Sequence, residues 1–225
     1  MNRHVHLPVL QETGFALLEP DRTEIDPAEW LGLTYQDWPE QDRTRFAPLA
    51  SATGSMDCNG FFQSVPPRAD RDGVWVESQR RIAPTLVERI QAIGARAGRC
   101  RVIELQPTTY EQALRNLHQD PNNWLNPDGE GWVVRSFMQL TDDPDSYMIL
   151  REDAADPATE TRIPLPAGTR FVVDSQRLWH AVWHPGDRPR YCVVSSLTSG
   201  PELRSWIDRH RRAPVGAGES VGHGS

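Results

Sequence analysis

The sequence contains no lysine, because all 24 of its basic residues are arginine. A catalytic lysine, a Schiff base and a phosphate-binding loop that depends on lysine are therefore excluded. Acidic residues number 31, so the formal net charge is −7 at pH 7 and the sequence pI is about 5.5. An acidic chain is poorly suited to non-specific binding of nucleic acid or of an anionic membrane surface.

Cysteine and long apolar runs are also scarce. Cys58, Cys100 and Cys192 form no paired motif and no zinc-ligand spacing, so we expect reduced thiols in a cytoplasmic protein. No run approaches the roughly 18 apolar residues of a membrane span. The N-terminal residues lead into polar sequence without an apolar core, so we expect no secretory signal.

The 225 residues suffice for one domain with a sizeable core. Segment 83–97 has apolar residues at helical spacing and predicts a helix that stops at Gly98. We expect one domain over residues 1–212, with its β core at about residues 100–200. The small and polar residues 213–225 predict a disordered tail.

After Gly98 the sequence alternates between short apolar segments and turns rich in Pro, Gly and Asp. Many short strands at close spacing predict an antiparallel sandwich or barrel with flanking helices. The expected strands are 101–105, 131–140, 146–150, 161–165, 169–173, 178–183 and 190–197.

His118 and Asp120 form a His-x-Asp triplet, and His180 follows in a distant predicted strand. Residues i and i+2 of an extended segment point to one face, so His118 and Asp120 can bind one metal ion. With His180 they offer two histidines and one carboxylate on one face of the ion, a set that suits Fe(II). Each residue alone has a plainer explanation: Asp120 can cap the turn at Pro121, and His180 can be a core histidine.

Arg190 lies ten residues after His180, at the start of the next predicted strand. Its guanidinium offers a planar, two-pronged donor for a carboxylate. The ligand that best matches both features is 2-oxoglutarate, whose keto-acid end chelates iron while its far carboxylate meets Arg190. Alone, Arg190 can equally be a surface strand residue, but the combination of these residues in this order is far more specific.

Taken together, these residues resemble the Fe(II)/2-oxoglutarate-dependent dioxygenases, whose fold is a double-stranded β-helix (a cupin-like jelly roll). Within that superfamily the chain looks most like the aspartyl/asparaginyl β-hydroxylases and their bacterial proline-hydroxylase relatives. The likeness covers about residues 100–200. Besides the ligands, it is carried by segments 135–141, 166–174 and 180–194.

The resemblance implies a site and its cofactors. His118, Asp120 and His180 would be the iron ligands and catalytic residues, Arg190 would bind 2-oxoglutarate, and O₂ would be the second cosubstrate. His184 is an alternative ligand, because it lies four residues after His180. The ten-residue step from His180 to Arg190 matches the family pattern, and the step from His184 does not.

Other positions depart from the family or extend it. Cys192 stands where the superfamily often has Ser or Thr, so a second donor for the far carboxylate must come from elsewhere. Phe137 stands where some members have His. Arg135 matches a position that contacts an acidic substrate in the family, with a salt bridge on the sheet as an equal alternative. Trp124 is a candidate substrate contact, or else a packed loop anchor.

The sequence thus predicts a 2-oxoglutarate-dependent hydroxylase that acts on an amino acid or peptide-like small molecule in a bacterial biosynthetic pathway. Asp120 favours hydroxylation, since halogenating relatives have a small residue there. Desaturation, ring closure and epimerisation stay open. The alternative is a cupin-like metal-binding barrel without oxygen chemistry, either an isomerase or a binding module whose eight tryptophans form an aromatic surface.

Overall fold

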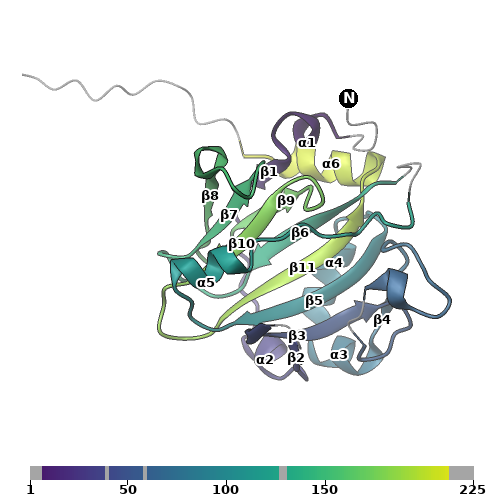
Figure 1. Cartoon of the computed structure of the whole chain (residues 1–225). Helices are drawn as coiled ribbons and strands as arrows, with labels where there is room; N and C mark the ends of the chain where they lie inside the picture. Colours follow the sequence, from purple (N-terminus) through teal and green to yellow (C-terminus); the bar gives the residue numbers. More distant parts are fainter. Residues whose placement is uncertain (1–6, 39–40, 58–59, 127–130, 213–225) are drawn as a thin grey trace, which may run out of the picture.

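The computed structural model describes residues 7–38, 41–57, 60–126 and 131–212 (Figure 1). The predicted tail at 213–225 and Cys58 lie outside these ranges. The strands are β1 (Phe15–Leu18), β2 (Gln36–Trp38), β3 (Gln41–Ser51), β4 (Val74–Trp75), β5 (Ala97–Leu105), β6 (Val133–Gln139), β7 (Tyr147–Arg151), β8 (Thr161–Pro164), β9 (Arg170–Val173), β10 (Trp179–Trp183) and β11 (Arg190–Thr198).

These strands form two antiparallel sheets. The large sheet has the order β1-β9-β6-β11-β5-β3-β2, with β4 paired to β3, and the small sheet has the order β10-β7-β8. Apolar side chains from both sheets meet in one buried cluster, so the sheets pack face to face. The cluster contains Phe137, Met148, Leu150, Ile163, Leu165, Phe171, Val173, Leu178, Cys192 and Val194.

Helices cover the other face of the large sheet, as Figure 1 shows for α4. Leu86 and Ile90 of α4 pack on Cys100 and Val102 of β5. Because side chains alternate along a strand, Arg101 between them is directed to the inner face, toward the small sheet. The helices are α1 (Pro8–Thr13), α2 (Ala28–Leu31), α3 (Glu77–Ile82), α4 (Pro84–Gln91), α5 (Tyr110–Arg115) and α6 (Pro201–His210), with short 3₁₀ turns at Phe61–Gln63 and Pro157–Thr159.

The two facing antiparallel sheets are those of a double-stranded β-helix, so the predicted fold class is confirmed. Each strand predicted after residue 98 has a counterpart, within a few residues at its ends. The strands of the first 75 residues were not predicted. In the described ranges, no helix has the length and apolar character that crossing a membrane requires.

The prediction that a helix runs to residue 97 and stops at Gly98 was wrong. The helix α4 ends at Gln91, and the chain turns at Gly94, whose φ is 79°. Gly98 instead lies inside β5. There its Cα lies so close to the backbone carbonyl of Asp70 that a Cβ atom would collide with it. Gly98 therefore allows two backbone segments to approach closely and does not end a helix.

Candidate metal centre and adjoining cavity

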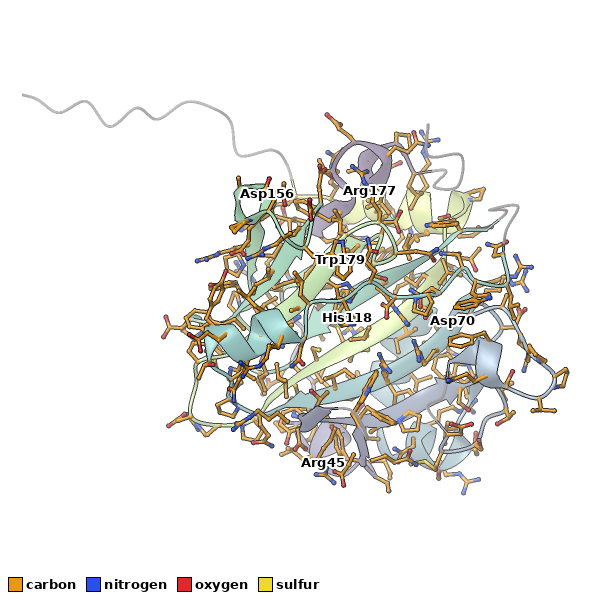
Figure 2. All side chains as sticks on the ribbon, in the orientation of Figure 1. Arg45, Asp70, His118, Asp156, Arg177 and Trp179 are labelled. Carbon is orange, nitrogen blue, oxygen red and sulfur yellow. The ribbon has the colours of Figure 1, made fainter. Side chains whose placement is uncertain are left out.

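The structure brings His118, Asp120 and His180 together. His118 and His180 pair as an antiparallel β-bridge, with N–H to O distances of 3.2 and 2.9 Å. The Asp120 N–H donates to the Ser175 carbonyl at 2.9 Å, which keeps segment 118–120 extended beside β10. As a result, one potential ligand atom from each of the three residues lies within 4.8 Å of the other two. Figure 2 places His118 over the middle of the large sheet.

Backbone carbonyls orient both imidazole rings. The His118 Nδ1 lies 2.8 Å from the Asn116 carbonyl, and the His180 Nδ1 lies 3.3 Å from the Leu178 carbonyl. A carbonyl only accepts, so in each ring the proton is assigned to Nδ1 and the Nε2 lone pair is left for a metal. The two Nε2 atoms lie 4.0 and 3.8 Å from the carboxylate oxygens of Asp120, too far for hydrogen bonds.

The charge states also fit metal binding. Burial, followed by the neighbouring His118, lowers the pKa of His180 to about 4. Burial alone would raise the pKa of Asp120, but Arg135, His180 and His118 together hold that pKa well below its usual range. At neutral pH His180 is thus neutral and Asp120 is ionised. A metal ion requires its histidine and carboxylate ligands in these forms, so the donor set fits a divalent ion such as Fe(II).

Arg135 lies behind Asp120 and is 1% exposed. Its Nε donates to Asp120 Oδ2 at 3.0 Å and its Nη2 donates to Asn122 at 2.7 Å. Its Nη1 donates to Ser196, and its Nη2 lies 3.6 Å from Asp70 Oδ2. For Arg135 the sequence left two alternatives, a contact with an acidic substrate and a salt bridge on the sheet. The structure shows the salt bridge. These contacts fix one oxygen of Asp120 and leave the other turned toward His118.

A cavity of about 280 Å³ adjoins the three ligand residues. Its volume is near the lower end of small-molecule sites, about 300–1,000 Å³. The walls come from both sheets, and most of their side chains are apolar. The larger apolar residues are Ile103, Leu105, Phe137, Met148, Val182 and Val194.

Arg190 lines this cavity and is buried, 2% exposed. Its Nη2 donates to the side-chain carbonyl of Gln139. Within the described residues its Nε has no hydrogen-bond partner and no carboxylate lies at ion-pair distance. Burial lowers the pKa of Arg190 from its ordinary value. The carboxylate of Asp143 also acts on this charge but contacts His184 at 2.8 Å. A buried cation that no carboxylate contacts directly is costly, so this position is suited to an anionic ligand.

Trp124 lies apart from this cavity. It is 70% exposed and stacks on Phe62, with ring centroids 5.6 Å apart and planes 14° apart. Both rings line a much smaller cavity, together with Asp70 and Arg99. The predicted substrate contact of Trp124 therefore remains a prediction, and residues 127–130 that follow lie outside the described ranges.

His184 also lies away from the ligand cluster. Its Nε2 donates to the Arg188 carbonyl at 2.7 Å, and its Nδ1 lies 2.8 Å from both Ser146 and Asp143. These contacts anchor the ends of two turns to each other. His180, not His184, shares the cluster with His118 and Asp120.

Sequence reasoning missed several residues around the site. Asp70, which Figure 2 shows to one side of His118, comes from the first 99 residues, where no motif was found. Gln139 lies in the predicted strand 131–140 and Asn122 in the turn after Asp120, and neither residue by itself forms a motif. Arg101 did have a signal, because it is a charged residue at the start of the predicted strand 101–105, between the apolar residues Cys100 and Val102.

Comparisons with known proteins support the fold. No protein-family model matches the chain, and no curated protein sequence matches it. A solved structure of an oxidoreductase of the 2OG-Fe(II) oxygenase family from Burkholderia pseudomallei has 16% identity and a TM-score of 0.53. It covers 87% of this chain and 90% of its own. At this identity the likeness establishes a shared double-stranded β-helix and nothing finer.

Two further solved structures are less similar. HygX from Streptomyces hygroscopicus, with nickel and 2-oxoglutarate bound, has 12% identity and a TM-score of 0.47 over 84% of each chain. SnoN, a non-heme α-ketoglutarate-dependent epimerase from nogalamycin biosynthesis, has 14% identity and a TM-score of 0.45. That match covers 83% of this chain and 78% of SnoN.

Proposed function

We propose that this protein is an Fe(II)- and 2-oxoglutarate-dependent oxygenase. It would hydroxylate an amino acid or peptide-like small molecule in the cytoplasm, as part of a bacterial biosynthetic pathway. One observation carries the proposal. A cluster of two histidines and one carboxylate, whose candidate ligand atoms lie within 4.8 Å of one another, adjoins a cavity that is also lined by the buried cation of Arg190.

The residues of the site would have separate roles. His118, Asp120 and His180 would hold Fe(II) on one face and leave its other positions open. Arg190 would bind the far carboxylate of 2-oxoglutarate through its two-pronged guanidinium, which Gln139 orients. Iron, 2-oxoglutarate and O₂ together supply an oxidant that removes hydrogen from a C–H bond, with succinate and CO₂ as coproducts.

The apolar cavity walls would position one substrate C–H bond and exclude water. Asp120 supports hydroxylation over halogenation, because as a metal ligand its carboxylate would take the position that a halide needs. Its contact with Arg135 keeps it in place as a ligand. The proposed hydroxylase activity thus depends on a fixed Asp120.

The test is the visible absorption of the protein loaded anaerobically with Fe(II) and 2-oxoglutarate. We expect the weak absorption band of an Fe(II)–keto acid complex, and we expect His118→Ala to abolish it. The His118 side chain is half exposed, so this change leaves the core packing intact. His210→Ala is the matched control, since His210 lies in α6 and contacts the Trp206 carbonyl.

Succinate release under air then measures turnover with candidate amino acids and peptides. If the folded, iron-loaded protein shows no band, the oxygenase proposal is wrong. Metal binding without the band would favour a cupin-like barrel that uses its metal for other chemistry.

A further inference from the structure

A second arginine, Arg101, lines the cavity beside the metal ligands. It lies in the middle of β5, where it pairs with Val194 of β11 on one side and Pro48 of β3 on the other. Since Cys100 and Val102 face the helices, the Arg101 side chain is directed into the space between the sheets. It is 7% exposed, so its charge is held largely out of water.

The guanidinium of Arg101 is held in place by an aromatic ring. Its Cζ lies 4.7 Å from the ring centroid of Trp38, which lines the same cavity. Phe46 supports that ring edge-on, with centroids 5.5 Å apart. Stacking on an aromatic ring fixes the plane of the guanidinium while its N–H groups still point outward in the plane. Arg101 is therefore pre-organised as a donor.

The charges around the cavity favour an anion. Leaving the two histidines aside, the described lining residues that carry a formal charge at neutral pH are Arg101, Asp120 and Arg190. Asp120 is already bound to Arg135 at 3.0 Å and is turned toward the histidines. The cavity thus presents two cations, and a metal ion would add to the positive charge.

The two cavity arginines are far enough apart to serve different ligands. Arg101 lies opposite Val194, four residues along β11 from Arg190. At about 3.3 Å per residue, this step separates the two backbone positions by about 13 Å along the sheet. Arg190 thus defines one end of the cavity, and Arg101 with Trp38 defines another wall.

We propose that Arg101, stacked on Trp38, binds a carboxylate of the substrate, so that the protein acts on a small organic acid. This inference rests on the proposed function, because it assigns 2-oxoglutarate to Arg190 and the substrate to Arg101. The apolar part of the substrate would lie on Ile103 and Phe137, between Arg101 and the metal ligands. A cavity of about 280 Å³, shared with 2-oxoglutarate, limits the substrate to a small molecule.

The experiment compares acids with their neutral amides. The probes are N-acetyl-L-alanine, N-acetyl-L-valine, N-acetyl-L-leucine and N-acetyl-L-proline, each also as the primary amide. Binding is measured by anaerobic calorimetry on the full chain loaded with Fe(II), with and without 2-oxoglutarate. We expect at least one acid to bind roughly 10- to 100-fold more tightly than its amide, the range of a hydrogen bond to a charged group.

Arg101→Gln should remove this acid–amide difference while changing the affinity for 2-oxoglutarate less than twofold. Trp38→Leu should weaken acid binding in the same direction, which keeps the test valid if Arg101→Gln does not fold. Arg162→Gln is the matched control, because Arg162 stacks on Tyr147 at 4.5 Å and is half exposed outside the cavity. It should retain the wild-type preference.

Three results would overturn the proposal. The first is that no acid binds to the wild type, and the second is that acids and amides bind equally. The third is that Arg101→Gln weakens 2-oxoglutarate more than it weakens the acids, which would make Arg101 a cosubstrate contact. A wild-type protein that does not bind 2-oxoglutarate at all would instead contradict the proposed function. The titrations without 2-oxoglutarate still test Arg101 in that case.

Discussion

The large sheet carries several buried arginines, and three of them differ in what surrounds the charge: Arg101, Arg135 and Arg190. Arg135 is neutralised by Asp120 and Asp70. Arg190 contacts the neutral amide of Gln139, and Arg101 lies on the ring of Trp38. An arginine bonded to a candidate metal ligand is placed to position that ligand, whereas a buried arginine that lines a cavity is suited to bind molecules in it. This difference supports the proposal that Arg135 holds the metal centre in place and that the other two bind ligands.

Arg135→Met should lower both the stability of the fold and its affinity for a metal ion. The change leaves the carboxylate of Asp120 buried without its bonded arginine, which costs about 3–5 kcal/mol for a broken buried pair. Asp70 keeps a second arginine, Arg99, at 4.0 Å. Loss of a residue that holds a metal ligand typically weakens metal affinity about 10- to 100-fold. We expect both effects, measured by urea denaturation and by competitive metal titration.

The matched control for Arg135→Met is Arg204→Met. Arg204 also lies beside an aspartate, Asp208, at 3.7 Å, but both side chains are largely exposed. An exposed pair contributes about 0–1 kcal/mol, so stability and metal affinity should hardly change. Unchanged metal affinity in a folded Arg135→Met protein would show that Asp120 needs no support from Arg135.

At the scale of elements, the site depends on a segment far away in sequence. The strand β5 and the segment around Asp70 approach so closely that residue 98 has to be glycine. Asp70 Oδ1 accepts the N–H of Arg99 at 2.7 Å, and its Oδ2 accepts the hydroxyl of Ser196 at 2.8 Å. The close backbone contact therefore sets the position of the carboxylate beside Arg135.

Gly98→Ala should disturb this arrangement. The new methyl group would collide with the backbone of Asp70, which must then move. Overpacking of this kind costs about 1–3 kcal/mol. Since Asp70 would move away from Arg135, we also expect weaker metal binding, measured alongside denaturant unfolding.

Gly94→Ala is the comparison for Gly98→Ala. Gly94 has a φ of 79°, but a Cβ there would meet no atom within 4 Å. Its cost should be backbone strain of about 1 kcal/mol, with metal affinity unchanged. Equal loss of metal affinity in both variants would contradict the role of the contact between Gly98 and Asp70.

At the scale of the whole molecule, sequence predicted the second half well and the first half poorly. The strands after residue 98 alternate in polarity and are separated by turn residues, so each is visible locally. The strand β3 has charged residues at its start and Pro48 inside it, which argues against a strand within a sheet. Its position follows from pairing with β5, and no local pattern records that pairing.

The site shows the same difference between local motif and completed fold. The residues His118 and Asp120 form a short motif, so their shared face was predictable. Asp70 and Arg135 are 65 positions apart, and only the completed fold brings them to 3.6 Å. The sequence therefore allowed prediction of the proposed ligands but not of the network that holds them.

The metal centre draws its residues from both sheets. His180 belongs to β10 of the small sheet, while Asp120 is tied through Arg135 to β6 of the large sheet. A metal ion held by His118, Asp120 and His180 would link the two sheets and bind only the folded state. At a free metal concentration of 100 times Kd, this adds about 2.7 kcal/mol, or roughly 5–10 °C in Tm for a chain of this size.

We expect anaerobic Fe(II), or Mn(II) as a stable substitute, to raise the Tm by this amount in differential scanning calorimetry. A chelator should reverse the shift. His118→Ala should remove most of it while leaving the metal-free Tm within a few degrees, since His118 is half exposed. His210→Ala should keep the full shift. Within the described residues, the group of side chains that could hold a metal ion is His118, Asp120 and His180. A metal-induced shift that survives His118→Ala would therefore mean that the ion does not bind at this cluster.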